Sequence, residues 1–350
     1  MPDLKALGPQ GVLRDGWTSS VDDYALACEW VLDGKALIVG DVAGSLCAYQ
    51  GKTGDVLWAH HETHDGGLLA LKRHPAGTAL ATAGQDGCVR IWVTEDGEPV
   101  TILELGTGWV EHLSWSPDGQ RLAVAFSRRV LVFDGDGHEV WQSDEQLSTV
   151  SAIAWANETE LAVAGYGSVC FFETTSGELL QKLEWQGSLV SMVLSPDGDI
   201  VACGSQDNSV HFWRRSTGED SMMSGYQGKP GALAFDHMGK LLATGGSKDV
   251  TVWSFDGDGP EGTRPGMLNL HARPVSTLTF APKGMRLASG ARDGSVAVWS
   301  LTSDGQGEAI GVALMDDRVS TIAWRPDGRA LSVVSANGGV TVLRVRSRES

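Results

Sequence analysis

Histidine and acidic side chains gather in one short segment of this 350-residue sequence, the run His60-His61-Glu62-Thr63-His64-Asp65. Imidazole nitrogens bind zinc and nickel, and carboxylates complete many such sites. The run therefore makes His60, His61 and His64 candidate ligands of a zinc or nickel ion in a metal-handling protein. If the run continues a β-strand, however, His60 and His61 point to opposite faces. No other cofactor is expected.

Two further sets of four residues share one spacing. Intervals of 18, 4 and 6 positions separate His64, Thr82, Asp86 and Trp92, and the same intervals separate His271, Ser289, Asp293 and Trp299. A spacing that recurs in two places predicts an internal repeat. No glycine-rich phosphate loop, Gly-x-Ser-x-Gly segment or Cys/His pairing points to a catalytic centre. We therefore expect a protein that is not an enzyme.

A sequence repeat of about forty residues runs through the whole chain, and this period is typical of units with four short strands. Each copy has apolar segments with period-two alternation, separated by Gly and Asp-Gly turns. The residues that precede the first segment of each unit are Tyr24, Gly67, Trp109, Thr149, Leu189, Pro230, Pro274 and Arg318. These eight markers predict eight units of an all-β chain.

A four-stranded sheet cannot bury both of its faces alone, so successive sheets must pack face to face in a ring. After the last expected strand, Gly339–Val345, too few residues remain for an outer strand. The segment around Val12–Asp15 can supply it. We expect one domain over residues 1–350, a closed eight-bladed β-propeller of four-stranded antiparallel blades completed by the N-terminal strand, with seven blades as the alternative.

This pattern resembles the WD-repeat family over nearly the whole chain. In that family a turn Asp, a loop His, a Ser or Thr hydroxyl and a Trp indole form a hydrogen-bond relay, and the two spaced sets match these four positions. The resemblance thus assigns His64 to a structural network, which competes with its role as a metal ligand. Other units keep only fragments, such as Asp207 with Trp213, and no matching Trp is followed by the Asp of the family's namesake dipeptide.

A second resemblance concerns the segment from Ala48 to Trp58, which looks like the tryptophan-docking motif of quinoprotein-type eight-bladed propellers. A weaker copy ends at Trp141. Those enzymes are exported and carry a metal-and-quinone pocket, so this resemblance implies a quinone-dependent enzyme. We favour packing between blades as the role of Trp58 and Trp141.

The balance of acidic and basic residues limits the kinds of partner that the protein can bind. The 27 basic and 44 acidic side chains give a net charge of −17, which disfavours nucleic acid. No apolar stretch approaches the roughly 18 residues of a membrane helix, and residues 1–8 carry no export signal. We expect a cytoplasmic protein that is a monomer or a subunit of a larger complex, with its five scattered cysteines reduced.

The WD-repeat resemblance implies a non-catalytic scaffold that binds a protein or peptide on the loop face around the central channel. Aromatic and arginine side chains dominate binding hot spots. The candidate partner-binding residues are Tyr24, Trp109, Leu189 and Arg318 among the markers, and Trp185, Tyr226, Arg273 and Arg292 in nearby loops. The arginines suit a partner that carries a carboxylate or a phosphate.

Overall fold

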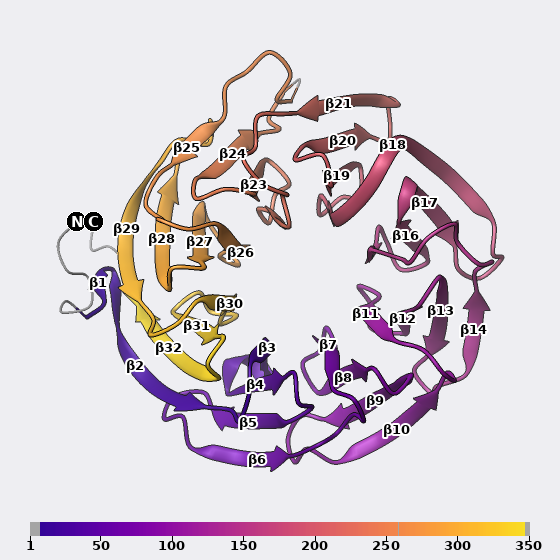
Figure 1. The fold of residues 1–350 in the computed structure, drawn as a ribbon, viewed down its shortest axis with the longest axis horizontal. Helices are drawn as coiled ribbons and strands as arrows, with labels where there is room; N and C mark the ends of the chain where they lie inside the picture. Colours follow the sequence, from indigo (N-terminus) through magenta and orange to yellow (C-terminus); the bar gives the residue numbers. More distant parts are fainter. Residues whose placement is uncertain (1–7, 258, 347–350) are drawn as a thin grey trace.

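The strands of the chain form a closed ring (Figure 1). The structure is a computed structural model that describes residues 8–257 and 259–346. The outermost residues of the expected 1–350 domain, 1–7 and 347–350, lie outside this range. No helix of the described part is long and apolar enough to cross a bilayer.

The elements follow one another in eight sheets, here called blades and numbered from the first complete one. Blade 1 has β3 (Ala25–Val31), the 3₁₀ helix η2 (Leu32–Gly34), β4 (Ala36–Asp41), β5 (Leu46–Gln50) and β6 (Val56–His60); blade 2 has β7 (Leu68–Arg73), β8 (Ala79–Gly84), β9 (Cys88–Val93) and β10 (Pro99–Glu104); blade 3 has β11 (Val110–Trp115), β12 (Arg121–Phe126), β13 (Arg129–Asp134) and β14 (Glu139–Gln142); blade 4 has β15 (Ala152–Trp155), β16 (Glu160–Ala164) and β17 (Tyr166–Glu173). The long β18 (Leu179–Leu194) is the outer strand of blade 4 and then the inner strand of blade 5, which continues with β19 (Ile200–Ser205), β20 (Val210–Arg214) and β21 (Glu219–Met223); blade 6 has β22 (Ala232–Phe235), β23 (Leu241–Gly245), β24 (Val250–Ser254) and β25 (Gly266–Leu268); blade 7 has β26 (Val275–Phe280), β27 (Arg286–Ala291), β28 (Ser295–Leu301) and β29 (Gly307–Leu314); blade 8 has β30 (Val319–Trp324), β31 (Ala330–Ser335) and β32 (Gly339–Val345), with β2 (Leu13–Ser20) as its outer strand.

The expected propeller of four-stranded antiparallel blades is confirmed. Within the described residues the strands make eight four-stranded units, and seven blades do not fit them. The ring closes as expected, because β2 pairs with β32 from Leu13↔Val345 to Ser20↔Gly339. One strand was not expected from the sequence: β1 (Gln10–Gly11) adds a short fifth strand outside β29 of blade 7.

Tryptophans tie the inner strands of neighbouring blades together. The indole N–H of Trp155 in blade 4 donates to Ser114 O of blade 3 at 2.9 Å, and three others donate in the same way to the preceding blade. These are Trp30 to Ala323 O, Trp115 to Lys72 O and Trp324 to Thr279 O. Each ring therefore fills the space between two sheets and also satisfies its polar atom.

Outer-strand tryptophans make a second set of links. Trp58 of blade 1 donates to Thr94 O of blade 2 at 3.2 Å and lies over the turn glycine Gly97. Trp17 of blade 8 donates to Gly51 O of blade 1 at 3.1 Å and lies over Gly54. Trp141 of blade 3 lies over Gly177 of blade 4, as the docking motif implies. The docking residues thus bridge three blade junctions.

Candidate functional site

The four spaced residues of blade 2 form a connected network. His64 Nε2 lies 2.8 Å from Thr82 Oγ1, and His64 Nδ1 lies 3.0 Å from Asp86 Oδ1. The Trp92 indole donates to the same Thr82 oxygen at 2.9 Å. Arg90 adds a bond to Asp86 Oδ2 at 2.8 Å. The network holds the loop that enters blade 2 against the sheet.

The matching network of blade 7 contains one additional residue. His271 Nε2 lies 2.7 Å from Ser289 Oγ, and the Trp299 indole donates to that oxygen at 2.8 Å. His271 Nδ1, however, contacts Ser295 Oγ at 2.6 Å, and Ser295 in turn donates to Asp293. The direct bond between His271 and Asp293 that the WD-repeat resemblance implied is therefore wrong, because the hydroxyl of Ser295 lies between them.

Burial decides the charge state of both histidines. Loss of hydration lowers the pKa of His64, and it lowers the pKa of His271 from 6.5 to about 4. For Asp86 burial alone would raise the pKa, but the hydrogen bonds from His64 and Arg90 together lower it. At neutral pH each relay therefore joins a neutral imidazole to a carboxylate, which is a structural arrangement.

Two residues expected to bind a partner belong instead to the blade interiors. Tyr226 Oη lies 2.7 Å from Thr244 Oγ1 and accepts the Trp253 indole N–H at 3.2 Å, so it takes the place of the relay histidine in blade 6. Trp185 takes that place in blade 5, where it packs on His211 at 4.0 Å. Both are only partly exposed, and the sequence signal was their distance of 18 residues from Thr244 and from Cys203.

The interior of blade 5 holds three rings in contact, one pair tilted and the other edge-on. His211 lies between Trp185 and Trp213, whose centroid is 4.2 Å away, and its side chain is 1 % exposed. Its Nε2 is 3.3 Å from an Asp220 carboxylate oxygen, but this contact lacks hydrogen-bond geometry. Among the described residues the His211 nitrogens and the Trp185 indole nitrogen are the buried polar side-chain atoms without a hydrogen bond. Burial lowers the pKa of His211.

Five other candidate residues lie directly before inner strands or in loops and turns beside them. Trp109 is 52 % exposed directly before β11, and the Arg318 guanidinium lies over the half-buried Tyr24 ring at 5.4 Å. Arg273 is exposed in the loop before β26, and Arg292 is exposed in the turn between β27 and β28. Among the described residues, these three arginines form no ion pair.

Leu189 was wrongly expected at this mouth. It is 1 % exposed and packs in the core with Val201 and Trp213. β18 runs unbroken from Leu179 to Leu194 and pairs in two sheets, so no loop carries Leu189 out to the surface.

The three histidines of the candidate metal site have separate partners. His60 Nε2 bonds to Gly97 O at 2.9 Å, and the exposed His61 pairs with Asp22 at 3.1 Å. His64 is committed to its relay. The structure therefore does not bring His60, His61 and His64 together as a ligand set.

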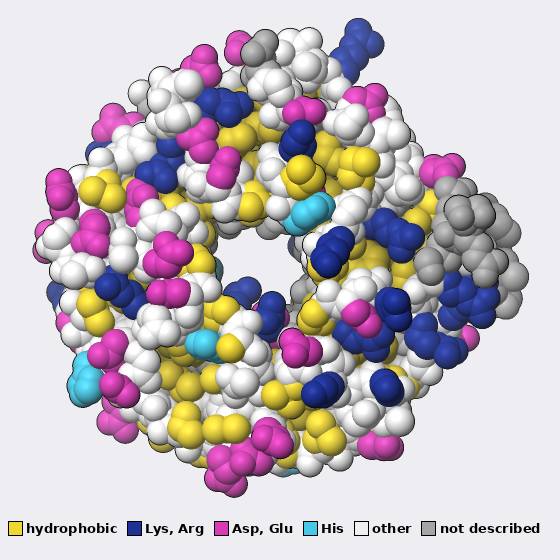
Figure 2. Space-filling model, turned by 180° about the vertical axis from the view of Figure 1, so that it is seen from behind, with side chains coloured by type: hydrophobic (Ala, Val, Ile, Leu, Met, Phe, Trp, Pro, Cys, Tyr) yellow, Lys and Arg dark blue, Asp and Glu magenta, His cyan; other side chains and the backbone are white. Residues whose placement is uncertain are grey.

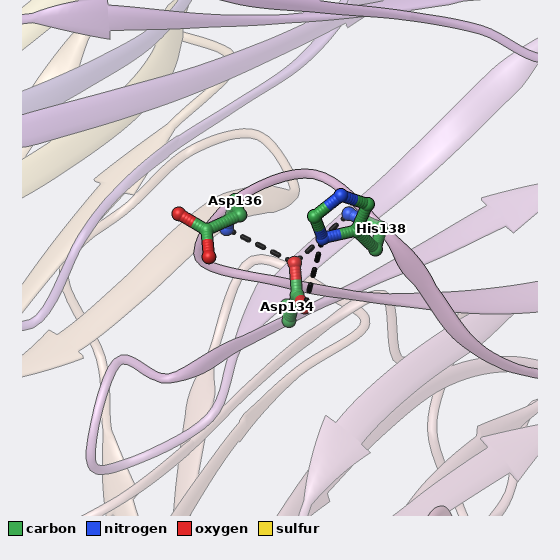
Figure 3. Close-up of side chains that lie close together, drawn as sticks. All are labelled: Asp134, Asp136 and His138. Atoms are coloured by element: carbon green, nitrogen blue, oxygen red, sulfur yellow. Dashed lines mark hydrogen bonds and ion pairs between the residues drawn. The ribbon is translucent and has the colours of Figure 1, made fainter.

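A different acidic group does converge, in the turn between β13 and β14 (Figure 3). Asp134 Oδ1 accepts the backbone N–H groups of Asp136 at 3.0 Å and His138 at 2.8 Å, and these bonds lower the pKa of Asp134. The His138 ring lies 3.4 Å from the other carboxylate oxygen. No motif in the sequence singled out these three residues. Their hydrogen bonds are those of an aspartate that closes a hairpin turn.

Viewed from behind, the ring shows an open channel and an uneven charge distribution (Figure 2). In this view lysine and arginine side chains gather mainly to the right of the channel, whereas aspartate and glutamate lie mainly to its left (Figure 2). The net charge of −17 is therefore not spread evenly over this face.

Two family models match the chain. Residues 14–222 match the model described as outer membrane protein assembly factor BamB, and residues 262–300 match the model described as WD domain, G-beta repeat. The first range holds the three docking tryptophans, Trp17, Trp58 and Trp141. The second holds the whole blade 7 relay, from His271 to Trp299.

Relatives with similar sequence are longer proteins. Protein hir1 of Schizosaccharomyces pombe is 26% identical over 81% of this chain and 36% of its own length. Periodic tryptophan protein 2 of Arabidopsis thaliana is 31% identical over 96% of this chain and 39% of its own length. The chain thus spans little more than a third of these two relatives.

Solved structures show the same fold. The computationally designed Ika8 protein superimposes with a TM-score of 0.81 at 20% identity, covering 96% of this chain and 100% of that one. A chain of the Mitotic Checkpoint Complex gives 0.66 at 22% identity, with 80% and 87% covered. By its repeats, its fold and these matches, the chain belongs to the WD-repeat family of β-propellers and also to the family whose model is described as outer membrane protein assembly factor BamB.

Proposed function

We propose that this propeller is a non-catalytic scaffold that binds a protein or peptide at the channel mouth formed by Tyr24, Trp109, Arg273, Arg292 and Arg318. The observation that carries the proposal is the half-exposed indole of Trp109 on the same ring of inner-strand entrances as the Tyr24–Arg318 pair. The exposed side of this indole packs against nothing unless a partner covers it. Tryptophan and arginine are the residue types that most often dominate binding energy.

The charge of the mouth suggests the chemistry of the partner. Three arginines without an ion pair among the described residues stand out in a chain of net charge −17. A guanidinium binds a carboxylate or a phosphate through two parallel hydrogen bonds. The partner segment is therefore acidic or phosphorylated. That a similar propeller was solved within the Mitotic Checkpoint Complex supports a role in assembly.

The test begins with the intact protein as bait in a native lysate, followed by affinity measurement with the purified partner. The double variant Trp109→Ala, Arg318→Ala should weaken binding at least tenfold and leave the melting temperature nearly unchanged, because both side chains are exposed.

The matched control removes an exposed apolar side chain and an exposed arginine elsewhere, through Met238→Ala and Arg264→Ala. It should retain the wild-type affinity. Equal binding by the wild type and the Trp109, Arg318 double variant would move the site away from the channel mouth.

A further inference from the structure

Each blade has one position, here called the plug position, from which the entering loop covers the sheet. It is found from the aromatic residue or leucine of the third strand, which pairs with one residue of the second strand. The plug position lies eighteen residues before the second-strand residue that comes two positions after that partner. In blade 7 that partner is Leu287, opposite Trp299, so the plug is His271. The same register makes His64, Trp185 and Tyr226 the plugs of blades 2, 5 and 6. Four blades therefore carry a ring there.

Three other blades fill this space with aliphatic side chains. Val21 is the plug of blade 1 and Met315 that of blade 8, and both pack against the adjoining core. In blade 3 the neighbouring Leu105 does the same. The chain thus covers seven of its blades with its own side chains.

Blade 4 is the exception. Leu161 pairs with Phe172, so Val163 occupies the place of Ser289 and the plug position falls on Glu145. Glu145 is about half exposed and forms an ion pair with Arg128, outside the sheet. A carboxylate over an apolar sheet without a partner would lose its hydration, and the outward ion pair avoids that cost.

The absence of a plug leaves a cavity of about 610 Å³ between blades 3 and 4, which adjoin in Figure 1. Its apolar wall includes Trp141, Val163, Cys170 and Phe172, with the Trp141 and Phe172 rings 5.1 Å apart. A volume of this size is within the usual range of ligand sites, roughly 300–1,000 Å³. An additional ring could lie against this wall, as rings do in blades 2, 5, 6 and 7.

The rim of the cavity is apolar and acidic. Leu147 is 89% exposed and Tyr166 is 59% exposed, and both line the opening. The lining ammonium of Lys182 is already paired with Glu184 at 2.8 Å. The lining carboxylate of Asp144 has no ion pair among the described residues, so the uncompensated charge is negative.

We propose that this cavity is a second binding site, which takes an aromatic side chain of a partner peptide flanked by lysine or arginine. The incoming ring replaces the plug that the chain lacks in blade 4, and the basic neighbour pairs with Asp144. The site differs from the channel mouth in its lining residues and in the charge of its ligand.

Three tripeptide amides, N-acetylated, probe the wild-type protein by titration calorimetry and ligand-observed NMR. The Lys-Trp-Lys peptide should bind at least tenfold more tightly than Lys-Ala-Lys, because only the former supplies a ring, and severalfold more tightly than Glu-Trp-Glu. Equal affinity for the tryptophan and alanine peptides excludes an aromatic site. Equal affinity for the basic and acidic peptides overturns the choice of partner charge.

Two variants of one residue locate the binding. Glu145→Trp provides the missing ring from the chain itself and should reduce Lys-Trp-Lys binding at least tenfold. Glu145→Ala breaks the same ion pair with Arg128 without filling the cavity, and should stay within twofold of the wild type. Unchanged binding by a folded Glu145→Trp variant refutes the proposal.

Alkylation of the wild-type protein gives a second readout that does not depend on the folding of a variant. Cys170 lines the cavity, whereas the equally half-buried Cys88 lies in blade 2. Saturating Lys-Trp-Lys peptide should slow iodoacetamide labelling of Cys170 severalfold and leave Cys88 unchanged. Equal rates with and without peptide overturn the site.

The remaining alternatives give separate results. Self-association of the wild type that Glu145→Trp abolishes would make a second copy of the chain the occupant, which overturns the basic-peptide proposal. The variant Trp109→Ala, Arg318→Ala should bind Lys-Trp-Lys like the wild type. The proposal for the cavity and the proposal for the channel mouth are therefore tested separately.

Discussion

At the scale of single residues, the two relays show how the same four-residue spacing is realised differently. In blade 2 the imidazole contacts Asp86 directly, whereas in blade 7 the hydroxyl of Ser295 lies between His271 and Asp293. Asp293 also accepts the backbone N–H of Ala272. The carboxylate of blade 7 therefore holds both the turn and the entering loop.

Removal of that carboxylate should destabilise the protein. Asp293→Ala leaves Ser295 and the Ala272 amide without their acceptor, which we expect to cost about 1–3 kcal/mol of the free energy of unfolding. Urea denaturation checks this. The control Asp304→Ala removes an exposed turn carboxylate of the same blade and should change stability by less than about 0.5 kcal/mol. Similar losses for both variants would show that Asp293 has no special role.

The buried histidines predict that stability falls in mild acid. His271 has a pKa of about 4 in the folded protein and 6.5 in the unfolded chain. Between these values the unfolded chain binds more protons, so the contribution of His271 is complete above pH 6.5 and is lost as the pH falls towards 4. At about 1.4 kcal/mol per pKa unit this contribution is about 3 kcal/mol.

Urea denaturation of the wild type at about pH 7.5 and about pH 4.5 measures this loss. His271→Gln cannot be protonated and should lose less stability between the two pH values. A drop remains in the variant, because burial also lowers the pKa of His64, His112 and His211. An equal drop in both proteins would contradict the assignment to His271.

At the scale of elements, the turn between the third and fourth strands receives the outer-strand tryptophan of the preceding blade. Gly97 and Gly218 occupy equivalent turns with φ of 76° and 75°. A Cβ on Gly97 would lie 2.6 Å from the Trp58 ring, whereas a Cβ on Gly218 would meet nothing within 4 Å. Both glycines have a positive φ, but only Gly97 has a tryptophan of the neighbouring blade packed against it.

Alanine at the two turns should therefore separate docking from backbone strain. Both substitutions cost the strain of a positive φ, and Gly97→Ala should cost a further amount of about 1–3 kcal/mol because the ring must move. Thermal and urea unfolding measure the difference. Equal destabilisation by Gly97→Ala and Gly218→Ala would show that the docked ring contributes little.

At the scale of the whole molecule, stability depends on ring closure by two chain segments that are far apart in sequence. β2 covers the outer edge of β32, with Leu13 fully buried and Trp17 docked on blade 1. Without β2, β32 would present an unpaired edge to other molecules.

Deletion of residues 1–20 should open this edge. We expect a loss of about 3–5 kcal/mol, a melting temperature lower by roughly 10 °C, and self-association visible in light scattering. A synthetic peptide of residues 10–20 added in trans should restore the melting temperature, whereas a scrambled peptide should not. A deleted protein as stable and monodisperse as the full chain would show that closure by β2 is dispensable.

The periodicity of the sequence determined the all-β class, the number of units and the closing strand. These features follow from local rules, because apolar alternation and turn residues specify strands, and a four-stranded sheet must pack against neighbours. The spacing of His64, Thr82, Asp86 and Trp92 likewise indicated a contact that lies within one blade.

Only the tertiary structure decided which side of a sheet or loop each residue occupies. Trp185 and Tyr226 are of the residue types that are common at binding hot spots, yet they fill blade interiors. Leu189 is buried because β18 has no break. The histidines of the 60–64 run separate because each one finds a different nearby partner. Glu145 lines the cavity of blade 4 and pairs with Arg128 of blade 3, a contact that only the tertiary structure reveals.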